Sequence, residues 1–198
     1  MTAAPGLNGL VLAGGRSRRF GQDKAALSID GQPLLDRTAA LLAPHVRQLR
    51  VSVRPAQADD ALRAAHTLII DDIEDGGPAA GLLAAHREAP DAAWLVLACD
   101  LPLLDAATVA QLVAARRPEC RATAFAAPGD QRPEPLCAIY EPAGLAALAG
   151  RATDGRSLSP RALLLDGDVE IVLPVRAETL SNMNRPEDFE RLKARGLC

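Results

Sequence analysis

The chain has 198 residues and a formal net charge of -3 at neutral pH, and 48% of its residues are hydrophobic. This length and composition suffice for one buried core, so we expect residues 1–198 to form a single domain. The slight acidic balance excludes the strong basic excess that is typical of nucleic-acid-binding proteins.

Targeting and redox signals are weak throughout the sequence. No apolar run approaches the roughly 18 residues that a membrane span requires, and the N-terminus lacks the pattern of a signal peptide. The four cysteines are not spaced like zinc ligands. We therefore expect a soluble cytoplasmic protein with free thiols and no membrane partner.

Short apolar runs alternate with helical segments along the first half of the chain. Strands are predicted at residues 9–12, 49–53, 67–70 and 94–98, and helices at 33–42, 57–65 and 78–87. These strands are continuously apolar, which is typical of strands buried on both faces. The alternation predicts an α/β fold with a mostly parallel, mixed sheet and helices on both faces.

The second half continues this plan. Asp105 is expected to cap a helix that ends at Ala115. Further strands are predicted at 122–126, 136–140 and 169–173, and a last helix at 186–194. Residues 128–135 read Pro-Gly-Asp-Gln-Arg-Pro-Glu-Pro, and this run of turn formers predicts a mobile loop over the functional site.

The segment from Leu12 to Lys24 is the most informative part of the sequence. It follows the first predicted strand and holds three glycines, three arginines and one lysine. Glycines let a backbone approach a ligand closely, and free N–H groups in such a loop can bind phosphate. The cationic side chains favour a triphosphate ligand. The segment matches neither the Walker A pattern nor the dinucleotide fingerprint G-x-G-x-x-G.

Carboxylates follow two other predicted strands. Asp71 and Asp72 come after the third strand, and Asp100 comes after the fourth. Ligands of open α/β sheets bind outside the carboxyl ends of the strands. A carboxylate there can bind Mg²⁺ or a hydroxyl or base of a nucleotide. Each feature alone could be a turn or a solvated face, but together they indicate a magnesium–nucleotide site.

These motifs, in this order, resemble the molybdenum cofactor guanylyltransferases of bacteria, which are nucleotidyltransferases with a Rossmann-like fold. The pattern Leu-Ala-Gly-Gly-x-Ser-x-Arg-x-Gly-x-Asp-Lys resembles their signature loop. The other resembling segments are Gly-Pro-Ala-Ala-Gly at 77–81, Cys-Asp-Leu-Pro at 99–102, the proline-led segment 132–138 and Asn-Met-Asn-Arg-Pro-Glu at 182–187. The resemblance covers nearly the whole chain.

The resemblance implies a reaction in which the GMP part of GTP is joined to the terminal phosphate of molybdopterin and pyrophosphate is released. It implies Mg²⁺ as the cofactor. GTP and molybdopterin are then the ligands, and the expected protein partners are cofactor-biosynthesis proteins and acceptor molybdoenzymes, which the chain would contact transiently.

The resemblance also assigns roles to residues. Asp100 would hold Mg²⁺, Lys24 the α- and β-phosphates, and Arg19 the pyrophosphate, with Arg16 as a further candidate for that contact, so that Lys24, Arg19 and Asp100 are the catalytic residues. Asn182 and Asn184 would contact the pterin, although Asn184 also suits a helix cap. The implied nucleotide-binding set is Leu12, Ala13, Gly14, Gly15, Arg19, Lys24, Asp71 and Asp100.

Two positions leave alternatives open. The spacing to Gly77 favours Asp71 over Asp72 as the nucleoside contact. The family often has a nucleotide-contacting asparagine where this chain has Val53, so either Ser52 or Arg54 substitutes for it, or nucleotide preference differs. Gly14 favours guanine enzymes, because related cytidylyltransferases usually have alanine there.

Other functions remain as alternatives. They are a cytidylyltransferase acting on molybdopterin, another small-molecule nucleotidyltransferase of the same fold, and a nucleotide-sensing module without catalysis. The presence of both Lys24 and Asp100 argues against the last of these.

Overall fold

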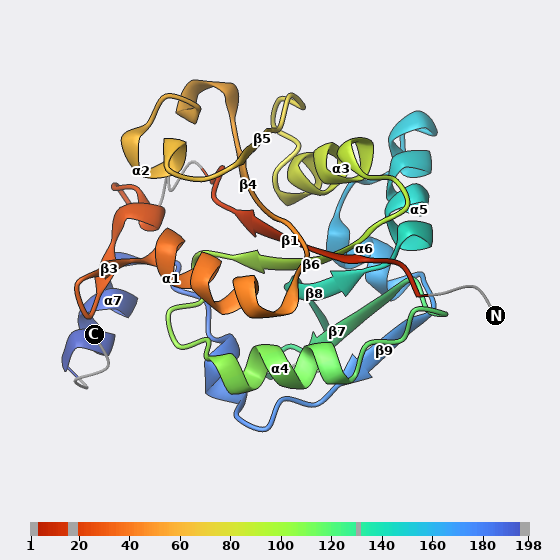
Figure 1. The fold of residues 1–198 in the computed structure, drawn as a ribbon. Helices are drawn as coiled ribbons and strands as arrows, with labels where there is room; N and C mark the ends of the chain where they lie inside the picture. The colour runs from red at the N-terminus through yellow and green to blue at the C-terminus, as the bar shows by residue number, and fades with distance from the viewer. Residues whose placement is uncertain (1–3, 16–19, 130–131, 195–198) are drawn as a thin grey trace.

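A seven-stranded sheet forms the centre of the molecule in the computed structural model, which describes residues 4–15, 20–129 and 132–194 (Figure 1). Every strand is parallel to the others except β8, which is antiparallel to both of its neighbours. The predicted mostly parallel, mixed sheet is therefore confirmed. The spatial order is β5 (Leu68–Ile70), β4 (Leu49–Val53), β1 (Leu7–Leu12), β6 (Ala93–Ala98), β8 (Pro133–Tyr140), β7 (Ala122–Ala126) and β9 (Val169–Val172).

Helices cover both faces of this sheet, as the sequence predicts. Leu95 and Leu97 of β6 pack in the core that holds α1 (Leu34–Leu42) and α4 (Ala106–Ala114). Trp94 and Val96 point to the opposite core, which the helices α3 (Pro78–Glu88), α5 (Pro142–Thr153) and α6 (Pro160–Leu165) complete. The strands are continuously apolar because both of their faces are buried.

The strand order of the sheet reverses next to β1. The chain runs from β1 outward to β4 and β5, and α3 then carries it back to β6 on the other side of β1. Such a switch point opens a crevice at the carboxyl ends of the strands. Gly81 lets α3 pack closely there, since a Cβ at this position would lie 2.4 Å from Ser52 Oγ.

Two predicted elements differ from the structure. The helix expected at 57–65 is reduced to α2 (Ala61–Ala64), preceded by a 3₁₀ turn η3 (Pro55–Gln57), because Asp60 caps a new helix at the backbone N–H of Arg63. The loop expected at 128–135 is wrong in its second part, because β8 already begins at Pro133. Proline is tolerated at the first residue of a strand and at irregular pairing, and both apply here.

Several elements were not predicted from the sequence. They include α5, α6 and the small hairpin of β2 (Ser28–Ile29) and β3 (Gln32–Pro33). The hairpin turn is Asp30-Gly31, with φ of 51° and 76°. Positive φ at both positions is the mark of a type I′ turn, for which Asp-Gly is a strong sequence signal.

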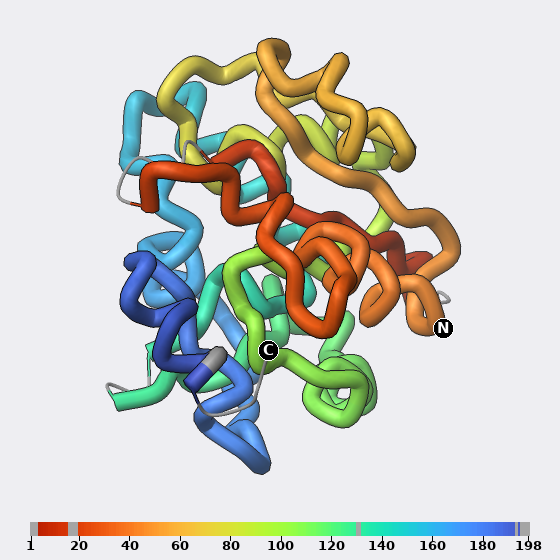
Figure 2. The backbone as a smooth tube through the Cα atoms, turned by 90° about the vertical axis from the view of Figure 1, so that its left-hand side faces the viewer, coloured from red at the N-terminus to blue at the C-terminus, as the bar shows by residue number. Residues whose placement is uncertain are grey.

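The C-terminal segment returns to the N-terminal part of the chain. Phe189 of α7 (Pro186–Ala194) and Met183 pack with Phe20, Ile29 and Leu34 in a third apolar cluster. Figures 1 and 2 show this segment, in blue, running beside the early part of the chain. The remaining 3₁₀ turns are η1 (Lys24–Ala26), η2 (Ala43–His45) and η4 (Ala177–Leu180).

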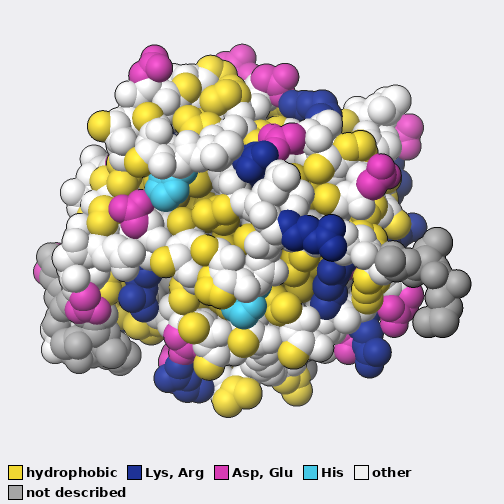
Figure 3. All heavy atoms as spheres, in the orientation of Figure 1, with side chains coloured by type: hydrophobic (Ala, Val, Ile, Leu, Met, Phe, Trp, Pro, Cys, Tyr) yellow, Lys and Arg dark blue, Asp and Glu magenta, His cyan; other side chains and the backbone are white. Residues whose placement is uncertain are grey.

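The surface seen in Figure 3 mixes both signs of charge. Lysine and arginine side chains form small groups among acidic ones on this face, in keeping with the net charge of -3. Among the described helices, none combines the length and the apolar character needed to cross a membrane.

Candidate functional site

A cavity of about 320 Å³ lies at the carboxyl ends of the central parallel strands. This volume is in the range of small-molecule binding pockets. Arg16 and Arg19 lie outside the described residues. The cavity is lined by seven of the residues that the sequence assigns to the nucleotide, namely Leu12, Ala13, Gly14, Gly15, Lys24, Asp71 and Asp100.

Lys24 and Asp100 meet in this cavity although they are 76 positions apart in the sequence. Lys24 Nζ lies 3.2 Å from Asp100 Oδ2, and the same ammonium lies 5.8 Å from the centre of the Phe20 ring. Lys24 begins η1, whose N-cap is Asp23, and Asp100 follows the end of β6. The structure thus brings together the cationic loop and the carboxylate.

The second oxygen of Asp100 is suited to a metal ion. Oδ1 is buried, and no described residue donates a hydrogen bond to it. A buried carboxylate oxygen without a partner is costly, and a hard cation such as Mg²⁺ takes oxygen ligands. The described residues contain no group of three or more potential metal ligands. Mg²⁺ commonly needs only one or two carboxylates when substrate phosphates complete its coordination, so the residues fit this ion.

Of the two candidate aspartates after β5, only Asp71 lines the cavity. It is 8% exposed, and its Oδ2 accepts a hydrogen bond of 3.2 Å from Ser52 Oγ. Burial raises the pKa of Asp71, against the opposing effects of Ser52 and Arg54. Asp72 instead lies on the surface, where it pairs with Arg87.

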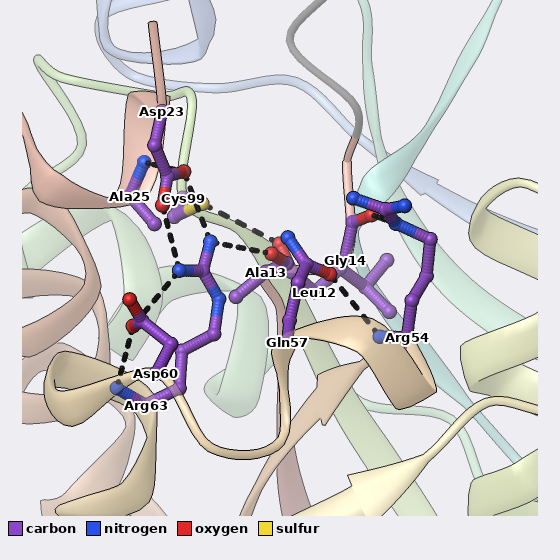
Figure 4. A network of polar contacts seen from close by, with 10 residues as sticks. All are labelled: Leu12, Ala13, Gly14, Asp23, Ala25, Arg54, Gln57, Asp60, Arg63 and Cys99. Atoms are coloured by element: carbon purple, nitrogen blue, oxygen red, sulfur yellow. Dashed lines mark hydrogen bonds and ion pairs between the residues drawn. The ribbon is translucent and has the colours of Figure 1, made fainter.

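Gly14 and Arg54 line the cavity together with Asp71, and Figure 4 shows the contact between Gly14 and Arg54. A Cβ on Gly14 would lie 3.0 Å from Asp71 Oδ2, so the absence of a side chain keeps this corner open. Arg54 Nε donates to the Gly14 carbonyl at 2.7 Å. Ser52 is buried and already bonded to Asp71. Of the two possible substitutes for the missing asparagine, Arg54 therefore has donors left for a ligand.

Cys99, which follows β6, forms a hydrogen bond to the end of β1. Its Sγ donates to the Leu12 carbonyl at 3.5 Å. Burial raises the pKa of this thiol to about 12. The thiol therefore stays protonated at neutral pH and serves as a hydrogen-bond donor rather than a nucleophile.

The two asparagines assigned to the pterin lie beside the cavity rather than in its wall. Asn182 and Asn184 are exposed, while Met183 between them is buried and donates its backbone N–H to the Asp100 carbonyl at 2.9 Å. The start of α7 is held by Asp188, whose carboxylate accepts from the backbone N–H groups of Asn184 and Arg185. The pterin contacts of these asparagines remain predictions.

Sequence reasoning did not single out Asp23 or Arg63. Arg63 is 1% exposed and binds the Asp23 carboxylate, the Asp60 carboxylate and the Ala13 carbonyl (Figure 4). Asp23 belongs to the signature loop, so its position beside Lys24 was a usable signal. Arg63 gave no such signal in the sequence, because an arginine in a helical segment is usually exposed to solvent.

Comparisons with known proteins identify relatives of this chain. A family model described as "MobA-like NTP transferase domain" matches residues 9–167. The chain is 37% identical over 203 residues to the "Molybdenum cofactor guanylyltransferase" of Xanthomonas euvesicatoria, and the match covers 97% of both chains. It is 34% identical to the "Molybdenum cofactor biosynthesis bifunctional protein" of Synechocystis sp., covering 94% of this chain and 53% of that protein.

A solved structure shares the fold. The molybdopterin-guanine dinucleotide biosynthesis protein A of Archaeoglobus fulgidus superposes with a TM-score of 0.76 at 22% identity, over 96% of this chain and 98% of that one. The Rossmann-like nucleotidyltransferase fold expected from the motifs is thereby confirmed. Because the family model covers well over half of the sequence, the chain belongs to the family of MobA-like NTP transferases.

Proposed function

We propose that this protein transfers the GMP moiety of GTP to the terminal phosphate of molybdopterin and releases pyrophosphate, with Mg²⁺ as cofactor. The meeting of Lys24 and Asp100 in a cavity lined by the signature loop carries this proposal. The choice of substrates is supported by a relative named "Probable molybdenum cofactor guanylyltransferase", 36% identical over 95% of this chain, and by one named "Molybdenum cofactor guanylyltransferase", 37% identical over 97%.

The reaction joins two anions, so its main demand is charge neutralisation. An oxygen of the molybdopterin phosphate attacks the α-phosphorus of GTP, and the bond from that phosphorus to the β-phosphate oxygen breaks. Lys24, which lies against Asp100 in the cavity, would neutralise the α- and β-phosphates. A phosphate nucleophile is already ionised at neutral pH, so no side chain has to act as a general base.

Asp100 is the residue that would hold the metal. Its Oδ1 is a buried acceptor without a hydrogen-bond donor among the described residues, and Oδ2 faces Lys24. When bound, Mg²⁺ supplies Lewis-acid stabilisation of the phosphate oxygens. Arg19 is proposed to contact the leaving pyrophosphate, on the basis of the signature pattern alone.

Asp71 and Arg54 are proposed to read the base. Ser52 occupies Oδ2 of Asp71, which leaves Oδ1 to accept from the N1–H and N2–H₂ edge of guanine. Arg54 on the same wall offers N–H donors that match O6 of guanine. Cytosine presents acceptors where guanine has these donors, so it would leave Asp71 unpaired.

The acceptor side and the cellular setting extend the same proposal. Asn182 and Asn184, next to Asp100, would contact the pterin through amide groups that both donate and accept. The proposed location is the cytoplasm. Transient docking to cofactor-biosynthesis proteins and to acceptor molybdoenzymes would deliver the substrate and receive the product.

A pyrophosphate-release assay tests the proposal directly. Each of the four ribonucleoside triphosphates is offered with Mg²⁺, with and without molybdopterin. We expect pyrophosphate release from GTP only when molybdopterin is present. Faster turnover of CTP than of GTP would identify a cytidylyltransferase, and GTP binding without release from any phosphorylated acceptor would identify a module without catalysis.

A further inference from the structure

One buried arginine contacts both ends of the signature loop, at Ala13 and at Asp23. Arg63 of α2 donates from Nη2 to the Ala13 carbonyl at 3.1 Å, where the chain leaves β1. The same guanidinium grips the Asp23 carboxylate with both of its terminal nitrogens, at 2.6 Å and 2.9 Å. Ala13 and Asp23 stand on either side of residues 14–22, so Arg63 fixes the spacing between the first and last parts of the loop (Figure 4).

Asp23 also fixes the backbone next to Lys24. Its Oδ1 also accepts from the backbone N–H of Ala25 at 3.1 Å and so caps η1, which begins at Lys24. Burial works against ionisation of Asp23, but the bonds to Arg63 and Ala25 outweigh it and hold the pKa of this carboxyl below its usual value. The direction in which Lys24 leaves the backbone therefore depends on an aspartate that Arg63 holds in place.

This arrangement is costly if stability is its only purpose. The Arg63 side chain is 2% exposed, whereas the side chains of Asp23 and Asp60 are 39% and 44% exposed. The main cost is therefore the burial of the guanidinium charge, which pairing with a carboxylate near the surface offsets only in part. Arg63 Nε is also buried with no hydrogen-bond partner among the described residues. By contrast, a planar guanidinium can bind a carboxylate through two bonds and a carbonyl at once, which is the geometry needed to set the distance between two chain segments.

We propose that Arg63 is a positioning residue that holds the loop and Lys24 in the geometry that binds triphosphate, without touching the nucleotide itself. This inference rests on the proposed function, since it assumes that the loop binds the phosphates of GTP. The proposal predicts different effects on the binding of the two parts of the ligand. The phosphates depend on Arg63, whereas the base depends on the wall formed by Asp71 and Arg54.

Equilibrium binding of three probes tests this separation. GTP, guanosine and inorganic triphosphate are titrated by calorimetry, in the presence of Mg²⁺, into the wild-type protein and into Arg63→Met and Arg63→Lys. We expect affinity for GTP and for inorganic triphosphate to fall at least tenfold in both variants. Affinity for guanosine should stay within twofold, and lysine should not rescue, because an ammonium cannot reproduce the two-pronged contact.

A second buried arginine provides the matched control. Arg151 of α5 is 6% exposed and binds Asp166 Oδ2 at 2.7 Å, and Figure 1 shows α5 far along the sheet from α2. Arg151→Met removes a comparable ion pair, so it should lower the melting temperature and leave the ratio of triphosphate to guanosine affinity unchanged. Asp60→Asn, which alters an Arg63 contact outside the loop, should also leave that ratio within twofold.

Asp23→Asn keeps the test decisive if Arg63→Met does not fold. It preserves an acceptor for Ala25 but loses the ion pair, so it should show the same selective loss of triphosphate affinity. A parallel fall in guanosine affinity, or unchanged triphosphate affinity in a folded variant, would overturn the role of Arg63. A wild-type protein that binds neither GTP nor inorganic triphosphate would instead overturn the proposed function.

Discussion

The proposed nucleotide side and the proposed acceptor side of the site are built in different ways. On the nucleotide side, residues from the ends of four strands face one cavity, and Lys24 and Asp100 already contact each other. On the acceptor side, Asn182 and Asn184 are exposed, and a backbone hydrogen bond from Met183 ties their segment to Asp100.

This difference shows how a parallel sheet organises a ligand. Residues that directly follow parallel strands share one edge, so their meeting is a consequence of topology. The asparagine segment follows a 3₁₀ turn and precedes α7, and its place depends on packing of Met183 in an apolar cluster. The nucleotide side should therefore be preformed, and changes there should have the larger effects.

The largest effect is expected for Asp100→Asn. The amide keeps the size of the side chain but removes the charge that would hold Mg²⁺, so turnover should fall about 1000-fold. Pyrophosphate release measures the loss, and a melting curve checks that the fold is retained. More than a tenth of wild-type turnover would remove Asp100 from the metal role.

Lys24→Met should be next in size. It removes the ammonium that faces Asp100 and that is proposed to contact the phosphates, so kcat/KM for GTP should fall about 100-fold. The exposed Arg87→Met is a suitable control for loss of a positive charge, since its partner Asp72 lies outside the cavity wall. An unchanged kcat/KM in Lys24→Met would exclude Lys24 from the phosphate site.

Asp71→Asn should separate binding from stability. Loss of a charged acceptor should raise KM for GTP about 10- to 30-fold. Because burial raises the pKa of this carboxyl above 3.8, its favourable contribution to folding is present below pH 3.8 and is lost as the pH rises through the raised value. The variant should therefore melt at a higher temperature than the wild type at pH 7.

The pH dependence of the same site provides an independent check. Wild-type affinity for GTP should weaken as the pH falls through the raised pKa of Asp71, which lies above 3.8. In Asp71→Asn this loss should be absent. Identical profiles in the two proteins would show that Asp71 does not bind the base as a carboxylate.

The smallest effects are expected on the acceptor side. Asn182→Ala and Asn184→Ala each remove neutral hydrogen bonds, so KM for molybdopterin should rise about 3- to 10-fold while KM for GTP stays constant. Asn182→Asp should weaken molybdopterin binding further through repulsion between like charges. An effect on GTP alone would reverse the comparison between the two sides.

The convergence of Leu12, Asp71 and Asp100 on one cavity was predictable because these residues follow recognisable apolar strands. Each of these residues lies where a strand ends, and the parallel topology brings these strand ends to the same edge of the sheet. Arg63 was not predictable, because the sequence pattern does not reveal that an arginine is buried against a carboxylate from another segment. Its contacts depend on a cap at Asp60 that shortens the expected helix.

Other misses have local causes. Asp30-Gly31 is a strong sequence signal for a β-hairpin, but no hairpin was predicted there. The strand β8 was shortened because Pro133 and Pro135 indicate a loop, whereas irregular pairing with β7 accommodates them. The order of strands around β1 needed the structure, because the sequence shows the alternation of elements but not the side on which each strand adds.

The central claim is that one triphosphate is held between the signature loop and Asp100. A crystal structure with GTP and Mn²⁺, which gives an anomalous signal in the place of Mg²⁺, tests this directly. We expect the metal peak about 2 Å from Asp100 Oδ1, with the phosphates beside Lys24 and the base against Asp71. A metal bound elsewhere, or a triphosphate lying away from Lys24, would contradict it.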